Sequence, residues 1–312
     1  MPKISVIIPV YNGALTLARA LDSIVHQTYP AHEIIVVDDG STDNTSSIAK
    51  GYVSKVKYIY QKNSGVSAAR NKGVEVSSGD WIAFLDCDDW YLPTRLESQV
   101  AVVNKWSFVD CVVGSFEYRN EEGELIKHSI DDNRKLLASI DSGRSGDIAL
   151  LGEDKDKRLF LEAQFSDTRC FSVKRELFHK SGGFPVGYQI CEDVVFIIRC
   201  IAQSSNVGVM CESTAVYFIH DAGLIRSNVE RAQFETIRAL KSMSCEITVM
   251  SKEVRQGWRN LVKSGYMNLF YFYLRAGLKT KAMKVLIKSF IFKPEMRDLR
   301  SFFSILVQEV EK

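Results

Sequence analysis

The sequence lacks the features that mark several large protein classes. No apolar stretch reaches 18 residues, so no segment is expected to span a bilayer. The N-terminus, MPKISVIIPVYN, has neither the long apolar region nor the small-residue cleavage site of a signal peptide. The seven cysteines form no Cys-x-x-Cys pair and their number is odd, which predicts a reduced chain rather than a disulfide framework. We therefore expect a cytoplasmic protein.

Two classes of nucleotide enzyme are disfavoured by what is missing after the first predicted strand. Dehydrogenases carry Gly-x-Gly-x-x-Gly at this place, and the segment PVYNGALTLARA does not. It also lacks the Gly-rich loop with Arg and Lys that a sugar nucleotidyltransferase uses for a triphosphate. The net charge of +2 gives no reason to propose a nucleic-acid partner.

The sequence does contain a clear alternation of strands and helices. Its 312 residues, 46% of them hydrophobic, suit one α/β domain with an appendage. Short β-branched runs occupy residues 4–10, 33–38, 56–61 and 81–86. Helical patterns separate them, and the first places Leu15, Ala18, Leu21, Ile24 and Val25 on one face. This alternation predicts a mostly parallel sheet with helices on both faces.

The pattern changes after Val109. We expect a hairpin over 110–130, an irregular excursion with one short helix over 131–160, and three strands at 168–173, 206–210 and 214–219. Helices are predicted at 174–184 and 192–203. From Asn228 the chain is predicted to be wholly helical, which divides it into a catalytic domain (1–227) and a helical region (228–312).

Polar side chains follow three of the four early strands, in the segments Pro9–Asn12, Asp38–Ser41 and Asp86–Asp89. In a parallel sheet these strand ends share one edge, where ligands bind. Asp86, Asp88 and Asp89 would repel one another unless a cation joins them or water solvates the turn. Because Mg²⁺ and Mn²⁺ share carboxylate ligands with substrate phosphates, the cluster indicates a site for a divalent cation and a diphosphate. An ordinary acidic turn is the alternative.

Two further residues belong to this edge. Asp39 could accept hydrogen bonds from a base or a ribose. Arg70, in GVSAARNKG, could bind a phosphate or stack on a base, and its alternative role is on a solvated helix face.

Five ordered motifs resemble those of family 2 glycosyltransferases with the GT-A fold. They are VIIPVYN, IIVVDDGSTDNT, NSGVSAARNKG, IAFLDCDDWYLP and ICEDVVFIIR, and the resemblance covers residues 3–220. It implies the Rossmann-like GT-A sheet with helices on both faces. It also implies inverting transfer of a sugar from a nucleotide-diphosphate donor, most commonly a UDP-sugar, to a hydroxyl of a glycan or lipid-linked acceptor.

The resemblance implies a role for each matching residue. Pro9 and Tyr11 fall among the donor-binding positions, Asp39 contacts the nucleoside, and Asp86 faces the ribose or donor sugar. Asp88 is the main ligand of Mn²⁺ or Mg²⁺, and His220 reaches the metal or the diphosphate; a structural role is the alternative for this histidine. Asp193 is the general base.

Asp193 has two alternatives beside it. Its neighbour Glu192 could be the base instead, and both acids could simply be favourable charge at a helix N-terminus. A non-catalytic nucleotide-sugar-binding module would have lost the base or the metal carboxylates, and this chain retains them.

The departures from the family pattern concern the acceptor. Processive synthases carry Gln-x-x-Arg-Trp shortly after the base, whereas this chain has Phe196-Ile-Ile-Arg199-Cys200. We therefore expect a non-processive enzyme of bacterial type that adds one sugar per encounter. Residues 119–165 match nothing specific, so acceptor recognition is expected there and in the tail.

The tail MNLFYFYLRAGLKTKAMKVLIKSFIF combines an apolar face with Lys279, Lys281, Lys284 and Lys288. It predicts either helices packed on the catalytic domain or contact with a lipid-linked acceptor or, peripherally, with the inner membrane face. The sequence leaves open whether the chain forms a homo-oligomer.

Overall fold

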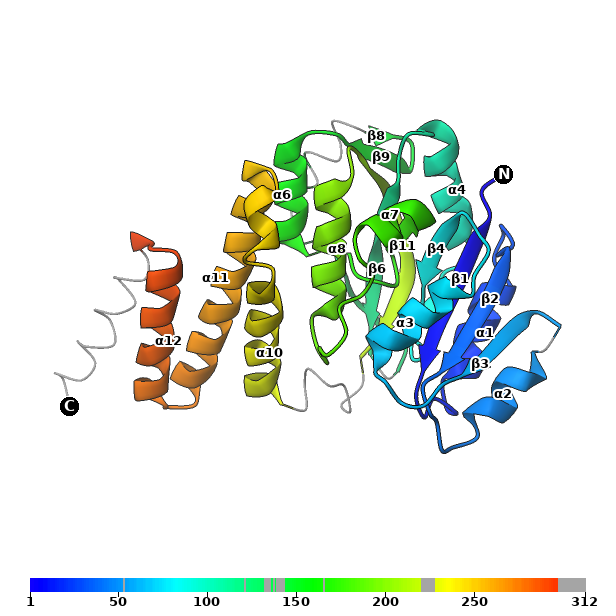
Figure 1. Cartoon of the computed structure of the whole chain (residues 1–312), viewed down its shortest axis with the longest axis horizontal. Coiled ribbons are helices and arrows are strands. Elements are labelled where there is room, and N and C mark those ends of the chain that lie inside the picture. The colour runs from blue at the N-terminus through cyan, green and yellow to red at the C-terminus, as the bar shows by residue number, and fades with distance from the viewer. Residues whose placement is uncertain are drawn as a thin grey trace.

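The computed structural model describes residues 1–52, 54–120, 122–131, 136, 138, 144–164, 166–219 and 228–296. A mixed sheet of 11 strands crosses the molecule in the order β3-β2-β1-β4-β10-β6-β11-β9-β8, with β5 and β7 paired to β11 and β6 (Figure 1). The first four strands are parallel neighbours, as the sequence predicts: β1 (Ile4–Val10), β2 (Glu33–Asp38), β3 (Val56–Tyr60) and β4 (Trp81–Phe84).

The predicted helices between these strands are present. They are α1 (Leu17–Val25), α2 (Thr45–Gly51), α3 (Val66–Glu75) and α4 (Arg95–Lys105). The face predicted for α1 is partly wrong, because Leu15 is fully exposed and Ala18 is only half-buried. The carbonyl of Gly13 accepts hydrogen bonds from the amides of Thr16 and Leu17 at 3.1 and 3.0 Å, so residue 15 belongs to a turn before the helix.

The second half of the sheet departs more from the prediction. Its strands are β5 (Trp90–Tyr91), β6 (Cys111–Arg119), β7 (Leu125–His128), β8 (Arg144–Ser145), β9 (Ile148–Leu151), β10 (Ser172–Lys174) and β11 (Val207–Phe218). The β6–β7 hairpin is confirmed, whereas the β8–β9 hairpin lies in the segment 131–160, where an irregular excursion with one short helix is predicted. The prediction of two separate strands at 206–210 and 214–219 is wrong. Both segments belong to the single strand β11, whose pairing with β6 is irregular between Met210 and Ala215.

Three helices complete this half: α6 (Asp154–Ala163), α7 (Arg175–Lys180) and α8 (Glu192–Gln203). A buried aromatic cluster fixes α8 against the sheet. The rings of Phe184 and Phe196 lie 4.2 Å apart, and Phe84 at the end of β4 lies 5.0 Å from Phe184. This packing holds the start of α8 near the carboxyl end of β4.

The C-terminal part is helical, as predicted, with α10 (Val229–Ser242), a 3₁₀ turn η1 (Glu246–Val249), α11 (Lys252–Arg275) and α12 (Lys279–Phe292). Gly257 lets α11 approach α6, because a Cβ there would lie 3.1 Å from Cβ of Leu161. The indole of Trp258 donates a hydrogen bond to the carbonyl of Leu240 at 2.8 Å. The first of these contacts packs α11 on the catalytic domain, and the second joins α11 to α10. The domain boundary at residue 227 stays a prediction.

Within the ranges that the structure describes, no helix combines the length and the apolar character that a membrane crossing needs.

Candidate active site

A cavity of about 560 Å³ opens at the carboxyl ends of β1, β2 and β4. It gathers six of the predicted site residues from four separate motifs: Pro9, Tyr11, Asp39, Arg70, Asp86 and Asp88. Glu192, Gln189 and Phe218 close it from the second half of the chain. Asp193 is the next residue after Glu192, and His220 lies outside the described residues. The parallel sheet thus brings the strand-end motifs together, as the sequence predicts.

Asp39 is buried at the rim of this cavity, with 3% of its surface exposed. Its carboxylate accepts hydrogen bonds from Nε2 of Gln61 at 2.7 Å and from the amides of Ser64 and Gly65 at 2.8 Å each. The loop after β3 is therefore anchored on this carboxylate. Gly40 follows it with φ +86°, and a Cβ there would lie 2.8 Å from the amide nitrogen of Asn63, so only glycine suits this turn.

Arg70 is buried and connects two motifs. Its guanidinium lies 2.7 Å from Oδ1 of Asp86 and 2.9 Å from Oε1 of Glu192, with 3% of the side chain exposed. The ring of Phe184 lies 5.0 Å away. Burial opposes the charge of Asp86, but Arg70 overcomes it and lowers the pKa of that carboxyl. Arg70 therefore lies on a buried face of α3, not on a solvated one.

Asp193 occupies a different electrostatic position from Glu192. Burial, followed by the charge of Glu192, raises the pKa of Asp193 to about 7, although Arg70 opposes the shift. Its Oδ1 accepts a hydrogen bond from the amide of Val194 at 2.8 Å. In the part of the chain that the structure describes, no cationic side chain donates a hydrogen bond to Asp193. The carboxyl of Asp193 can consequently change protonation near neutral pH.

Asp88 is half-buried in the cavity wall. Its backbone carbonyl accepts a hydrogen bond from Arg19 at 2.7 Å, and this guanidinium stacks over Trp90 at 4.1 Å. The described residues hold no group of three or more His, Cys, Asp or Glu arranged for a metal. Mg²⁺ is usually bound by one or two carboxylates plus substrate phosphates. The carboxylate oxygens of Asp88 therefore fit an ion whose coordination a bound diphosphate completes.

The third carboxylate of the cluster, Asp89, does not line the cavity. It is 1% exposed, and its Oδ2 lies 2.9 Å from Nε of Arg169. Arg169 also lies 2.9 Å from Asp167, and its guanidinium packs 4.3 Å from the Tyr217 ring. Burial raises the pKa of Asp89 although Arg169 opposes the shift. Asp89 thus anchors the strand-end loop to the segment before β10.

Sequence analysis missed Arg169 and Asp167. The segment 168–173 was expected to be a strand, but β10 begins only at Ser172 and a turn precedes it. An arginine in such a turn carries no periodicity, so the sequence offers no signal that it meets Asp89. The alternative of a solvated acidic turn therefore does not describe Asp89, because this residue is buried and paired with Arg169.

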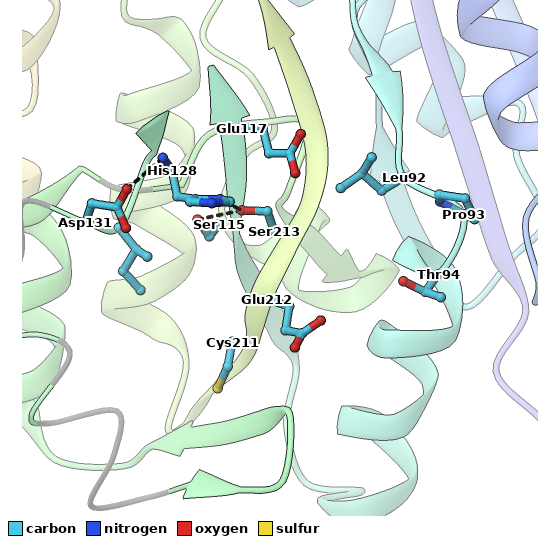
Figure 2. A pocket seen from close by; sticks show the side chains of 11 residues that line it. Leu92, Pro93, Thr94, Ser115, Glu117, His128, Asp131, Cys211, Glu212 and Ser213 are labelled. Atoms are coloured by element: carbon cyan, nitrogen blue, oxygen red, sulfur yellow. Dashed lines mark hydrogen bonds between the residues drawn. The ribbon is translucent and has the colours of Figure 1, made fainter. Parts of the chain in front are cut away.

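A second cavity, of about 550 Å³, lies at a gap in the edge of β11 (Figure 2). β9 pairs with β11 as far as Met210 and β5 pairs with it from Ala215, so Glu212 and Ser213 lie between the two. Nδ1 of His128 lies 2.8 Å from Oγ of Ser213, and Figure 2 labels both side chains in the wall of this cavity. Asp131 accepts a hydrogen bond from the amide of His128 at 2.9 Å. Acceptor recognition by residues 119–165, which contribute to this wall, stays a prediction.

The comparisons with known proteins agree with this geometry. Residues 5–182 match the family described as Glycosyl transferase family 2. Glycosyltransferase GlyA of Streptococcus pneumoniae is 41% identical over 135 residues, which cover 42% of this chain and 19% of the relative. The putative glycosyltransferase EpsH of Bacillus subtilis is 29% identical over 251 residues, covering 77% of this chain and 67% of the relative. An uncharacterized glycosyltransferase of Rickettsia felis is 38% identical, but the match covers only 22% of its length.

Solved structures share the fold. TarS of S. aureus (residues 1–349, in complex with UDP-GlcNAc) has a TM-score of 0.65 at 17% identity, with 91% of this chain and 90% of TarS covered. The mannosyltransferase PcManGT of Pyrobaculum calidifontis (in complex with GDP-Man and Mn²⁺) has a TM-score of 0.65 at 16% identity, with 99% and 81% covered. The family match spans more than half of the chain, and the neighbours share its GT-A architecture; the chain belongs to glycosyl transferase family 2.

Proposed function

We propose that this glycosyltransferase transfers one sugar, with inversion and with a divalent cation, from a nucleotide-diphosphate sugar to a hydroxyl of a glycan or lipid-linked acceptor. The observation that carries the proposal is the pair of ion pairs made by Arg70. They connect Asp86, which follows β4, to Glu192, the first residue of α8 and the neighbour of Asp193; Arg70, Asp86 and Glu192 all line one cavity. The bound UDP-GlcNAc of TarS and the GDP-Man and Mn²⁺ of PcManGT support a donor and cation of this class.

The donor would lie across the carboxyl ends of β1, β2 and β4. Pro9 and Tyr11 border the cavity on one side, and Tyr11 is 53% exposed, so its ring is accessible to a ligand. We assign nucleoside contact to Asp39, whose rigid anchoring keeps its carboxylate at a fixed depth. Asp86, oriented by Arg70, is assigned to the ribose or the donor sugar.

Asp193 is proposed as the general base. As the acceptor oxygen attacks the anomeric carbon, its proton passes to the carboxylate of Asp193. The bond from that carbon to the diphosphate breaks on the opposite face, and the configuration inverts. A base is most effective when its pKa lies near the working pH, and the raised pKa of Asp193 meets this condition. Glu192 is less suited because Arg70 binds its carboxylate.

Asp88, with His220 as a further ligand, would hold Mn²⁺ or Mg²⁺. A bound cation of this kind neutralises the charge that develops on the departing diphosphate. Asp88 and Asp86 both line the strand-end cavity, which supports the assignment of the diphosphate to this side of it.

The test is a panel of nucleotide sugars assayed for hydrolysis with Mn²⁺, with Mg²⁺ and with EDTA, together with calorimetry of UDP binding. We expect turnover of at least one donor and tighter nucleotide binding with the metal. Equal affinity in EDTA would contradict the proposed metal dependence. Metal-dependent binding without turnover of any donor would instead favour a nucleotide-sugar-binding module.

A further inference from the structure

The C-terminal helices enclose a groove that shares no lining residue with the active-site cavity. α10, α11 and α12 lie side by side at the opposite end of the molecule from α2 (Figure 1). A cavity of about 460 Å³ runs between them. Each helix contributes residues spaced three or four apart, and one helix face therefore borders the groove in each case. The lining is Glu230, Phe234, Ile237, Arg238, Lys241, Tyr266, Leu269, Tyr273, Lys281, Lys284, Val285 and Lys288.

The groove has an apolar floor and a cationic rim. Ile237, Leu269 and Val285 are buried at its base, while Phe234 is 46% exposed. Five of the lining residues are cations and one, Glu230, is an acid. That acid is already occupied, since its carboxylate accepts a hydrogen bond from Tyr273 at 2.6 Å and lies 3.2 Å from Lys281.

The cations of the rim differ in the contacts that they make with other described side chains. Arg238 pairs with Glu235 at 2.7 Å, and Lys241 lies 3.5 Å from the hydroxyl of Tyr266. Lys284 and Lys288 are exposed, and among the described residues neither has a carboxylate within ion-pair distance. These two lysines, one helical turn apart on α12, are therefore available to an external anion.

The outer face of α12 continues this combination of apolar and cationic side chains. Ile287 and Ile291 are 46% and 75% exposed and alternate with Lys284 and Lys288 along the helix. An apolar surface interleaved with lysines matches the boundary between headgroups and acyl chains of an anionic bilayer, where apolar burial and attraction to lipid phosphates act together. A small soluble anion would not require the exposed isoleucines.

We propose that the groove between α10, α11 and α12, together with the exposed face of α12, is a docking surface for a membrane that contains anionic phospholipid. Lys284 and Lys288 contact the headgroup phosphates, and Phe234 enters the acyl-chain boundary. The inference rests on the C-terminal helices alone and does not depend on the donor or the base.

The test is flotation of the full chain with vesicles of phosphatidylcholine, with and without phosphatidylglycerol. Each lysine near an anionic surface contributes about fivefold to binding. Lys284→Gln combined with Lys288→Gln should therefore lower binding to anionic vesicles by roughly 30-fold. Phe234→Ser should lower it by about tenfold through lost apolar burial. High salt should weaken the wild type, since the Debye length falls from about 10 Å at 0.1 M to about 3 Å at 1 M.

The matched control is Lys50→Gln combined with Lys55→Gln, which removes two exposed lysines in and after α2, at the far end of the molecule (Figure 1). It should leave vesicle binding unchanged, and both double variants should bind nucleotide as the wild type does. Equal binding to neutral and anionic vesicles, an equal loss in the control, or no binding at low salt would overturn the proposal. So would competition by inorganic phosphate at low concentration, because that would indicate a site for a single anion.

Discussion

The two ends of the molecule place charge in opposite ways. At the strand edge, acids outnumber cations. Arg70 and Arg169 are buried there together with their partners Glu192 and Asp89, whereas Asp86 keeps 29% of its side chain exposed. In the C-terminal groove, cations outnumber acids and stay exposed. Buried pairs depend on one another, because removal of one partner leaves a desolvated charge. An exposed lysine, by contrast, can be replaced without leaving a desolvated charge. The first arrangement suits a fixed geometry for chemistry, and the second suits adhesion to a surface without fixed geometry.

The largest effect is expected at Asp193. Asn has nearly the same shape but cannot accept the acceptor proton, so Asp193→Asn should lower transfer by roughly 10²–10⁴-fold. Donor affinity should stay close to that of the wild type. Asp88→Asn should weaken both metal-dependent nucleotide binding and transfer. Transfer rates and calorimetry on the same preparations measure both quantities.

Two controls accompany this comparison. Glu192→Gln distinguishes the neighbouring acid: if it abolished transfer while Asp193→Asn retained it, the assignment of the base would be wrong. Unfolding in urea at pH 8 tests for damage to the fold. A buried carboxyl with a raised pKa destabilises the folded state above its unfolded pKa, so Asp193→Asn should increase the free energy of unfolding at that pH.

The second prediction concerns Arg70. Arg70→Gln leaves Asp86 and Glu192 without their cation, and the loss of one partner from a buried ion network costs about 3–5 kcal/mol of stability. Surface substitutions usually change stability by less than about 0.5 kcal/mol, so Lys284→Gln is the matched comparison from the other end of the chain. Urea unfolding of both variants measures the difference. Equal stabilities would show that the buried pairs do not stabilise the edge.

The pH dependence of Arg70→Gln follows from the sign of the shift at Asp86. A carboxyl whose folded pKa is lowered stabilises the protein above its unfolded pKa, and this contribution disappears as the pH falls through the folded value. The difference in stability between wild type and Arg70→Gln should therefore be larger at pH 7 than at pH 3.

The difference between the two ends also explains which features could be predicted from the sequence. The four parallel strands and their motif residues were predictable, because buried parallel strands are continuous apolar runs and their ends share an edge. The partners of Arg70 and Asp89 were not. Arg70 and Glu192 are 122 positions apart, and only packing of the aromatic cluster brings them together. Local pattern likewise could not show that the β11 segments form one bent strand.

The third prediction is the pH profile of transfer. Because Asp193 must be deprotonated to act as base, kcat/KM should fall about tenfold per pH unit below the pKa of Asp193, near 7, and level off above it. The matched measurement is vesicle binding between pH 6 and pH 8, which should not follow the pH profile of transfer, because Asp193 takes no part in the proposed membrane contact. A flat kcat/KM profile down to pH 5 would contradict the assigned base.

The smallest effect is expected within the C-terminal helical region, between α10 and α11. Trp258 of α11 donates its indole N–H to the carbonyl of Leu240, and the ring is buried beside Phe292. Trp258→Phe keeps most of the apolar contact but leaves that carbonyl without this donor, which costs about 1 kcal/mol. Because α11 also packs on α6 through Gly257, the helices should unfold together with the sheet in a single transition. Urea unfolding followed by far-ultraviolet circular dichroism and by aromatic fluorescence tests this. A C-terminal transition that separates from the main one in Trp258→Phe would show that the helices are held to the catalytic domain only weakly, and would make them a movable membrane contact rather than a fixed part of the enzyme.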